Sequence, residues 1–393
     1  MSMCSMPRFS SSPARTRTRR RWLAGALAAL LLLGSGGWWL KMRLWGAAPL
    51  PIPRGTPIDA PAELARWPWR GVRVSRPHLG VTRWHKLQRD GTLVELLEFD
   101  FKADPGLHWA IADQDENDDK PFDNRVDFWD RSAAVMSREL NHRFAAHKQG
   151  KVVAAWNGAF FGYDVKTNSR IAFHVSPVVL NGQAHYAKGA NHRWTVGTKT
   201  VNGKTEWKVV HLPPAKTLAQ QFDWAAGSVQ CLVKDGKPLH LQPFPHSAKE
   251  FLKAPVPSTP QDVGHIPDFD HMKSCRASLA WNRDSSTMWL LIVKEPDTES
   301  ASITMLRRGL PMGGGWMVSD LQKFWMSRKV WCAVNSDAGD VGQRLLLLPN
   351  GSYDWIPPRL VSGKLEMPLK PDLSDAPAGG APLMTFYVRD ARG

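Results

Sequence analysis

The chain of 393 residues predicts an α+β fold, with multi-stranded mixed sheets and a few flanking helices, preceded by one transmembrane helix. Short apolar runs bounded by turn residues predict the strands, and two longer runs with one apolar face predict helices. An uncharged stretch near the N-terminus predicts the membrane segment. Because 43% of the residues are hydrophobic, the chain can bury a large core, which excludes a disordered protein.

The first predicted element is the apolar segment 22–40, which contains no charged residue. A helix of roughly nineteen residues just spans a hydrocarbon core of about 30 Å. Six arginines precede the segment and only Lys41 and Arg43 follow it closely, which predicts a cytoplasmic N-terminus. We interpret residues 1–21 as a cytoplasmic basic tail and the segment as a single-pass signal-anchor in the inner (plasma) membrane. The alternative is a signal peptide cleaved near residues 45–48.

The positive charge is concentrated in this N-terminal region. Residues 1–54 contain nine basic and no acidic residues, so the formal net charge of +15 leaves only +6 for the rest. Nucleic acid is therefore not an expected partner. Residues 41–67 are rich in proline and predict a stiff linker, so that residues 68–393 form the folded domain. This domain is expected to be periplasmic or extracellular.

Hairpins supply the strands of the predicted domain. Asn202-Gly203 separates "HRWTVGTK" from "TEWKVVHL", and Asp90-Gly91 separates "VTRWHKL" from "TLVELLEFDF". The segments "CRASLAW" and "TMWLLIVK" flank a third turn in the same way. A strand pattern of this density predicts a domain made mostly of sheet.

Two helices are predicted from apolar residues three or four positions apart, which share one face of a helix. These residues are Ala133, Met136, Leu140 and Phe144 in the first helix, and Met317, Leu321, Phe324 and Trp325 in the second. Each helix leads into a short apolar strand, and these strands reach Asn157 and Asn335. Polar side chains at the end of a buried strand are costly to hold there, so Asn335, Ser336 and Asp337 at the end of the second strand are expected to have a function.

Four motifs occur in the order "VVAAWNGAFF", "CRASLAW", "GGGWMVSDLQ" and "VWCAVNSDAGD". Together they resemble the motifs of the phosphodiester glycosidase family, which includes the lysosomal uncovering enzyme and many bacterial proteins of unknown role. The resemblance extends over roughly Leu93 to Leu348. It implies a phosphodiester glycosidase-like fold and a hydrolase that cleaves a sugar-1-phosphodiester linkage in a glycan or envelope polymer.

The resemblance also implies roles for matching positions. The catalytic candidates are Asp337, Asn335 and Arg276, and the substrate-binding candidates are Asn157, Gly158, Gly315, Asp320 and Gly339. Trp316, on the glycine-rich loop, is the expected stacking residue for a sugar ring. Ala159, Ala338 and Asp340 stand where the family has glycine. The alternative function is therefore a catalytically inactive module that binds a glycan or envelope polymer.

The chemistry of these residue types supports the same roles. The guanidinium of Arg276 is always charged and can hold two phosphate oxygens at once. Asp337 follows a buried strand among small residues, so it can activate water or stabilise an oxocarbenium ion. Gly313 to Gly315 precede a helix, where bare backbone amides favour an anion. The open alternatives are a structural ion pair for Arg276 and a turn residue for Asp337. An ordinary helix cap from Ser319 or Asp320 is the alternative to anion binding.

No cofactor is expected with certainty, although two clusters have ligands for a divalent metal. Asp113, Asp115 and Asn117 alternate as in a calcium loop, but Asp118 occupies the expected glycine, so we expect a solvated acidic loop. The second cluster contains Asp262, His265, Asp268, Asp270 and His271. Such residues in a proline-containing loop are usually unliganded.

Three cysteines lie in the exported domain, where disulfides can persist. Cys332 lies inside an apolar strand and is expected to be a buried, reduced thiol. The sequence therefore favours a disulfide between Cys231 and Cys275.

Overall fold

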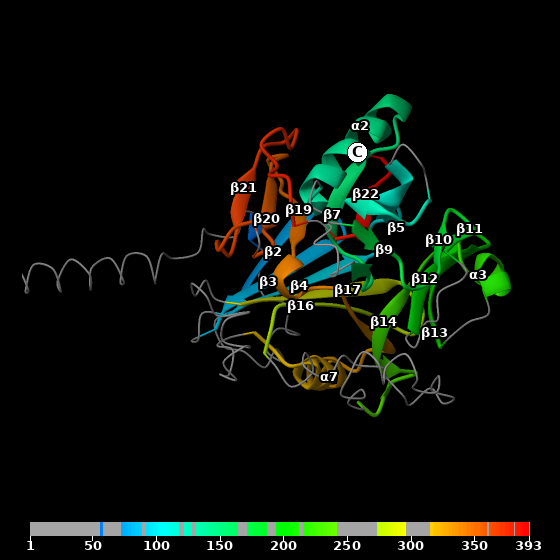
Figure 1. Ribbon diagram of the computed structural model, residues 1–393. Coiled ribbons are helices and arrows are strands. Elements are labelled where there is room, and N and C mark those ends of the chain that lie inside the picture. The colour runs from blue at the N-terminus through cyan, green and yellow to red at the C-terminus, as the bar shows by residue number, and fades with distance from the viewer. Residues whose placement is uncertain are drawn as a thin grey trace, which may run out of the picture. The chain divides into compact units, whose positions relative to one another are not determined.

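Two large antiparallel sheets face each other, and the described residues include a helix packed on the outer side of each sheet (Figure 1). The computed structural model describes residues 56–57, 72–88, 92–117, 122–127, 131–163, 171–186, 194–211, 215–241, 273–295, 315–359, 361–380 and 382–392. All of them belong to the second of the two units into which the chain divides, Met1–Ile52 and Pro53–Gly393.

The predicted cytoplasmic tail, the membrane segment and the cluster from Asp262 to His271 lie outside the described residues. In the part of the chain that the structure describes, no helix is both long and apolar enough to cross a bilayer. Within the range predicted as a linker, Thr56–Pro57 forms the short strand β1 and pairs with Ser75 and Arg76.

The larger sheet has thirteen strands. Its main order is β1, β2 (Arg73–His78), β3 (Val81–Leu87), β4 (Leu93–Asp100), β17 (Thr287–Lys294), β16 (Arg276–Trp281), β18 (Cys332–Ser336), β14 (Trp224–Lys234), β10 (Val178–Leu180) and β11 (Gln183–His185). The hairpin of β12 (Trp194–Val201) and β13 (Lys204–His211) and the short β15 (Lys237–Pro238) join it at β14.

The second sheet has six strands in the order β21 (Met367–Leu369), β20 (Tyr353–Ile356), β19 (Arg344–Leu347), β7 (Lys151–Asn157), β22 (Met384–Asp390) and β5 (Leu107–Asp113). A small third sheet contains β6 (Val126–Asp127), β9 (Ile171–Phe173) and β8 (Gly162–Tyr163). The helices among the described residues are α2 (Ala133–His147), α3 (Ala215–Gln221) and α7 (Val318–Ser327), with short 3₁₀ turns η2 (Asp115–Asn117) and η3 (Gly339–Val341).

The prediction of a mostly stranded α+β domain with few helices is confirmed, but the prediction of mixed sheets is wrong. Every strand pairing between described residues is antiparallel. The physical reason lies in the connections. Hairpins join many of the strands, and a tight hairpin can join only antiparallel neighbours.

Both predicted helices form as expected. The buried residues of α2 include Ala133, Met136, Leu140 and Phe144, and this helix packs on β7. The apolar face of α7 packs on the opposite side of the larger sheet, in one core cluster with residues of β16, β17 and β18. The two sheets meet through aromatic side chains, such as Phe99 of β4 stacked 6.3 Å from Trp156 of β7. The order of layers is therefore helix, sheet, sheet, helix (Figure 1).

Candidate functional site

Asp337 and Asn157 are in contact, although they come from different sheets. Asn157 is the last residue of β7, and Asp337 directly follows β18. The Asn157 Nδ2 group donates a hydrogen bond to Asp337 Oδ2 (3.3 Å), and the Asp337 backbone amide donates to the Gly158 carbonyl (2.8 Å). Asn157 Oδ1 accepts from the Gln343 amide (2.8 Å). The structure thus brings together two of the predicted site residues, Asn157 and Asp337.

Asn335 lies close in sequence but has different neighbours. In the register of the sheet it stands opposite Ser278 on β16 and Gln230 on β14. Its Nδ2 donates to Gln230 Oε1 (2.6 Å), and its buried Oδ1 has no hydrogen-bond partner among the described residues. Ser278 accepts from the indole of Trp325 on α7, and directly opposed residues share a face of the sheet. Asn335 therefore belongs to the layer beneath α7 rather than to the Asn157–Asp337 contact.

Arg276 begins β16 at the sheet edge that carries Asp337, since Ala277 pairs with Ser336. Its Nε donates to the Trp316 carbonyl (2.9 Å), which orients the guanidinium. Ser274 and Trp316 in turn form an isolated antiparallel bridge. A backbone segment therefore helps to position the Arg276 guanidinium.

Gly315 meets a conformational requirement in the same segment. It has a φ of +74°, and a Cβ atom there would lie 2.5 Å from the Ser274 carbonyl oxygen. Its amide donates to Thr92 Oγ1 (2.9 Å), so this amide is already bonded within the protein. The indole of Trp316 donates to Gln88 Oε1 (3.3 Å) and the ring lies 5.8 Å from Phe324.

The two remaining predicted site residues differ in setting. Asp320 accepts a hydrogen bond from the Met317 amide (3.0 Å) at the start of α7, as a helix-capping residue does. Gly339 begins η3 with a φ of +62°, and its amide donates to the Cys275 carbonyl (3.2 Å). Among the described residues, no atom outside its two chain neighbours lies within 4 Å of a Cβ built on Gly339, which is two positions after Asp337.

A second polar group, of which the sequence indicated only the two aspartates, lies on the other side of β22. We name Asp113, Asp115, His174 and Tyr186 the Asp113 cluster. His174 Nε2 lies 3.1 Å and 3.0 Å from the two carboxylate oxygens of Asp113. Tyr186 donates its hydroxyl to Asp115 Oδ2 and stacks on the His174 ring at 4.2 Å. His174 Nδ1 and Asp115 Oδ1 are buried without hydrogen-bond partners among the described residues.

The start of β22 separates this cluster from Asn157. The Leu383 carbonyl accepts from the Gln114 amide (3.0 Å), and the neighbouring Met384 carbonyl accepts from the Gly158 amide (2.8 Å). Because β5 and β7 flank β22, Asp113 and Asn157 leave the same sheet edge two strand spacings apart, roughly 10 Å.

The prediction of a solvated acidic loop at Asp113 and Asp115 is wrong, because both side chains are fully buried. Burial raises the pKa of Asp115 to about 6, and the nearby Asp113 charge acts in the same direction, although the Asn124 amide opposes it. The alternation of these aspartates was a visible signal. Their partners His174 and Tyr186 each follow a three-residue strand, and the sequence gave no signal that either residue belongs to a site.

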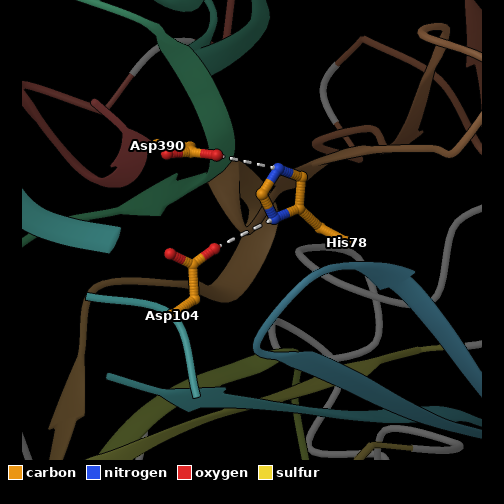
Figure 2. Close-up of side chains that lie close together, drawn as sticks. All are labelled: His78, Asp104 and Asp390. Carbon is orange, nitrogen blue, oxygen red and sulfur yellow. Dashed lines mark ion pairs between the residues drawn. The ribbon is translucent and has the colours of Figure 1, made fainter. Parts of the chain in front are cut away.

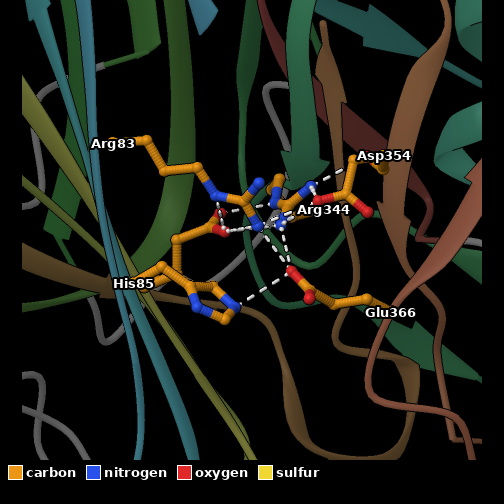
Figure 3. A network of polar contacts seen from close by, with 6 residues as sticks. Arg83, His85, Arg344, Asp354 and Glu366 are labelled. Atoms are coloured by element: carbon orange, nitrogen blue, oxygen red, sulfur yellow. Dashed lines mark hydrogen bonds and ion pairs between the residues drawn. The ribbon is translucent and has the colours of Figure 1, made fainter. Parts of the chain in front are cut away.

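Two other clusters have metal-ligand chemistry, with donor atoms within 4.8 Å of one another. In the first, His78 lies between Asp104 and Asp390 (Figure 2), and Arg392 pairs with both carboxylates. In the second, composed of His85, Glu95 and Glu366 (Figure 3), Arg83 and Arg344 pair with the carboxylates. Arginines already supply the positive charge that a metal would bring, so we interpret both clusters as ion-pair networks.

The predicted disulfide between Cys231 and Cys275 is wrong in this structure, where Cys231, Cys275 and Cys332 are buried and form no disulfide. Cys231 lies on β14 opposite Val334, and Cys275 precedes β16, on the other side of β18. Two strand spacings, roughly 10 Å, separate such positions, whereas a disulfide requires Cα atoms within about 7 Å. Burial also raises the pKa of the Cys332 thiol to about 11.

No protein-family model and no curated protein sequence matches the chain. Among solved structures, the chain is similar to the zebrafish N-acetylglucosamine-1-phosphodiester alpha-N-acetylglucosaminidase catalytic domain auto-inhibited by its pro-peptide. The identity is 13%, the match covers 86% of this chain and 97% of that one, and the TM-score is 0.46.

Two further solved structures are similar at comparable levels. A hypothetical protein from Synechocystis is 11% identical over 82% of this chain and 64% of its own, with a TM-score of 0.43. A putative exported protein from Burkholderia pseudomallei is 12% identical over 76% of this chain and 74% of its own, with a TM-score of 0.42. Values this low do not establish a shared activity.

Proposed function

We propose that the protein is a membrane-anchored, extracytoplasmic hydrolase that resembles phosphodiester glycosidases and cleaves a sugar-1-phosphodiester linkage in a glycan or envelope polymer. The observation that carries this proposal is the hydrogen bond between Asn157 Nδ2 and Asp337 Oδ2. This hydrogen bond lies at the junction of the two sheets, and among the described residues a Cβ built on the nearby Gly339 meets no atom within 4 Å other than those of its chain neighbours, which supports a site there.

In this proposal Asp337 activates water or stabilises the oxocarbenium-like transition state. Asn157 orients the carboxylate, because its own Oδ1 is held by the Gln343 amide. Arg276, anchored through Nε, binds the phosphodiester from the neighbouring strand. A phosphodiester is already a good leaving group, so the reaction needs less acid assistance than an ordinary glycoside. The anchor is the apolar segment 22–40, and the sequence around it supports an extracytoplasmic domain.

A binding module without catalysis is the second candidate, and Ala338 favours it. This residue directly follows Asp337 and is half-buried. It carries a methyl group at a position where the phosphodiester glycosidase family has glycine. Ala159, in contrast, is buried, so its methyl group packs in the interior. Both candidates bind the same polymer and differ in whether it is hydrolysed.

The test compares full-length protein in detergent with the variants Asp337→Asn and Arg276→Lys on an activated sugar-1-phosphodiester. Asp337→Asn preserves shape and removes a charge, so turnover is expected to fall roughly 10²–10⁴-fold while binding persists. Arg276→Lys replaces a guanidinium that can bind two phosphate oxygens with a single ammonium charge, so it is expected mainly to weaken substrate binding.

The matched control is Asp372→Asn, at an exposed aspartate, which should leave turnover unchanged. If wild-type protein binds the glycan but releases no product, the binding module becomes the better account. If Asp337→Asn fails to fold, Asp337 is a structural turn residue.

A further inference from the structure

A groove lies along β5, the terminal strand of the six-stranded sheet. Its volume is about 510 Å³, within the range of roughly 300–1,000 Å³ that is usual for ligand sites. One wall comes from α2, β5 and β22, and the other from the β12–β13 hairpin with the start of β14. The lining does not include Asn157, Arg276, Asn335 or Asp337, so the groove is distinct from the candidate active site.

The first wall is basic. Arg143 and His147 of α2, His108 of β5 and Arg389 of β22 line it, and Glu116 is the acidic residue in the lining. Arg389 is held in place, since its guanidinium carbon lies 5.0 Å from the Phe144 ring and Nη1 donates to the Gln149 carbonyl (3.4 Å). The lining thus contains two guanidinium groups, one of them oriented, while the acidic Glu116 interacts with Arg143, and this excess of positive charge favours an anionic ligand.

Electrostatic effects within the groove agree with this picture. Burial raises the pKa of Tyr387 to about 12, while the positive charges of Arg389 and Arg143 act in the opposite direction. Burial lowers the pKa of His108, and the Arg389 charge lowers it further, whereas Asp390 and Asp104 oppose this. The positive charges of both arginines therefore reach side chains that line the groove.

The opposite wall offers uncharged polar groups. Thr198 and Thr200 of β12 and Thr205 of β13 contribute hydroxyls, of which the Thr200 hydroxyl also bonds the Asp223 carboxylate, and Asn181 contributes an amide. Hydroxyls and amides both donate and accept hydrogen bonds, as sugar hydroxyls require. The partly exposed indole of Trp224 adds a flat apolar surface that suits the C–H face of a sugar ring.

We propose that this groove is a binding site for an acidic saccharide, whose anionic groups contact Arg143 and Arg389 and whose hydroxyls contact the threonine wall. An acidic peptide added to the edge of β5 is the competing occupant. A peptide bound in that way needs pockets for alternate side chains, whereas the wall facing β5 presents hydroxyls and an amide. Binding here does not rest on the proposed hydrolase activity, because the site shares none of its residues.

The test measures binding of fluorescently labelled trigalacturonate to the full chain in detergent. An uncharged galactose trisaccharide and hexaglutamate serve as comparison probes. Arg143→Gln is expected to weaken trigalacturonate binding about tenfold, the effect of losing one charge-assisted contact. Thr200→Val is expected to weaken it severalfold. Arg76→Gln changes the net charge equally at an exposed position on β2 outside the groove, and should leave binding unchanged.

Three outcomes overturn the proposal. The first is no saturable binding of trigalacturonate by a wild-type protein that is folded by circular dichroism. The second is equal loss of binding in Arg143→Gln and Arg76→Gln, which would show a nonspecific charge effect. The third is tighter binding of hexaglutamate with no effect of Thr200→Val, which would identify a peptide site.

Discussion

Two buried polar regions of this protein differ in how their charges are balanced. The inter-sheet ion network joins the facing sheets (Figure 3) and contains Arg83, His85, Glu95, Arg344, Asp354 and Glu366. Arg344 is bidentate to Glu95 through Nε and Nη2, both at 2.6 Å, and Arg83 Nε donates to the same carboxylate at 2.6 Å. Arg83 Nη1, Arg344 Nε and Glu95 Oε1 are among the buried atoms of the network that have no hydrogen-bond partner among the described residues, so the contact between the last two is an ion pair only.

The Asp113 cluster is equally buried but contains two carboxylates and no arginine. The pKa values separate the two regions. Burial alone would raise the pKa of Glu366, but the His85 hydrogen bond and the charges of Arg83 and Arg344 lower it to about 2. In the cluster, burial prevails and the pKa of Asp115 rises to about 6. In the network, ion pairs stabilise the buried charges. In the cluster, burial makes the ionised form of Asp115 unfavourable, and a carboxyl with a pKa shifted in this way is typical of groups that take part in chemistry.

The largest change in the free energy of unfolding is expected from a substitution of Arg344 in the network. Arg344→Met keeps the side-chain volume but leaves Glu95 buried with one arginine fewer, so the free energy of unfolding should fall by about 3–5 kcal/mol. Urea denaturation measures this change. Lys102→Met removes one partner of an exposed ion pair with Asp284 and should cost far less. Equal losses in both variants would remove the distinction between a network that holds the sheets and ordinary surface pairs.

The pH dependence of stability in acid tests the contribution of Glu366 to the network. Because the folded-state pKa is depressed from 4.5 to about 2, this group contributes stability above pH 4.5 that is lost as the pH falls toward 2. The expected contribution is on the order of 3 kcal/mol. Denaturation curves between pH 2 and pH 6 should show a shallower dependence for Glu366→Gln than for wild-type protein. Parallel curves would contradict the prediction.

A smaller effect of opposite sign is expected at Asp115. Its folded-state pKa is raised, so the folded state favours the protonated carboxyl and loses stability as the pH rises from about 4 through about 6. Asp115→Asn cannot ionise, and it should be more stable than wild-type protein at pH 7.5 and similar to it at pH 4. Thermal denaturation at both pH values measures the difference. An Asp115→Asn variant that is destabilised most at pH 7.5 would show that the charged form is the one the fold prefers.

The sequence by itself determined those features that depend on neighbouring residues. The apolar faces of α2 and α7 follow from spacing along a helix, and the β12–β13 hairpin follows from Asn202-Gly203, both with positive φ. Sequence reasoning also identified Asn157 and Asp337 as strand-end polar residues, because local pattern is enough to show where a buried strand stops.

Tertiary structure alone decided which distant residues meet. His174 bonds Asp113 across 61 positions and Arg83 bonds Glu366 across 283, and neither pairing leaves a trace in periodicity. The order of strands in the sheets also placed Cys231 and Cys275 on opposite sides of β18 and directed Asn335 toward α7. The physical reason is that side-chain alternation specifies the two faces of a strand but not its neighbours, which depend on the packing of the whole domain.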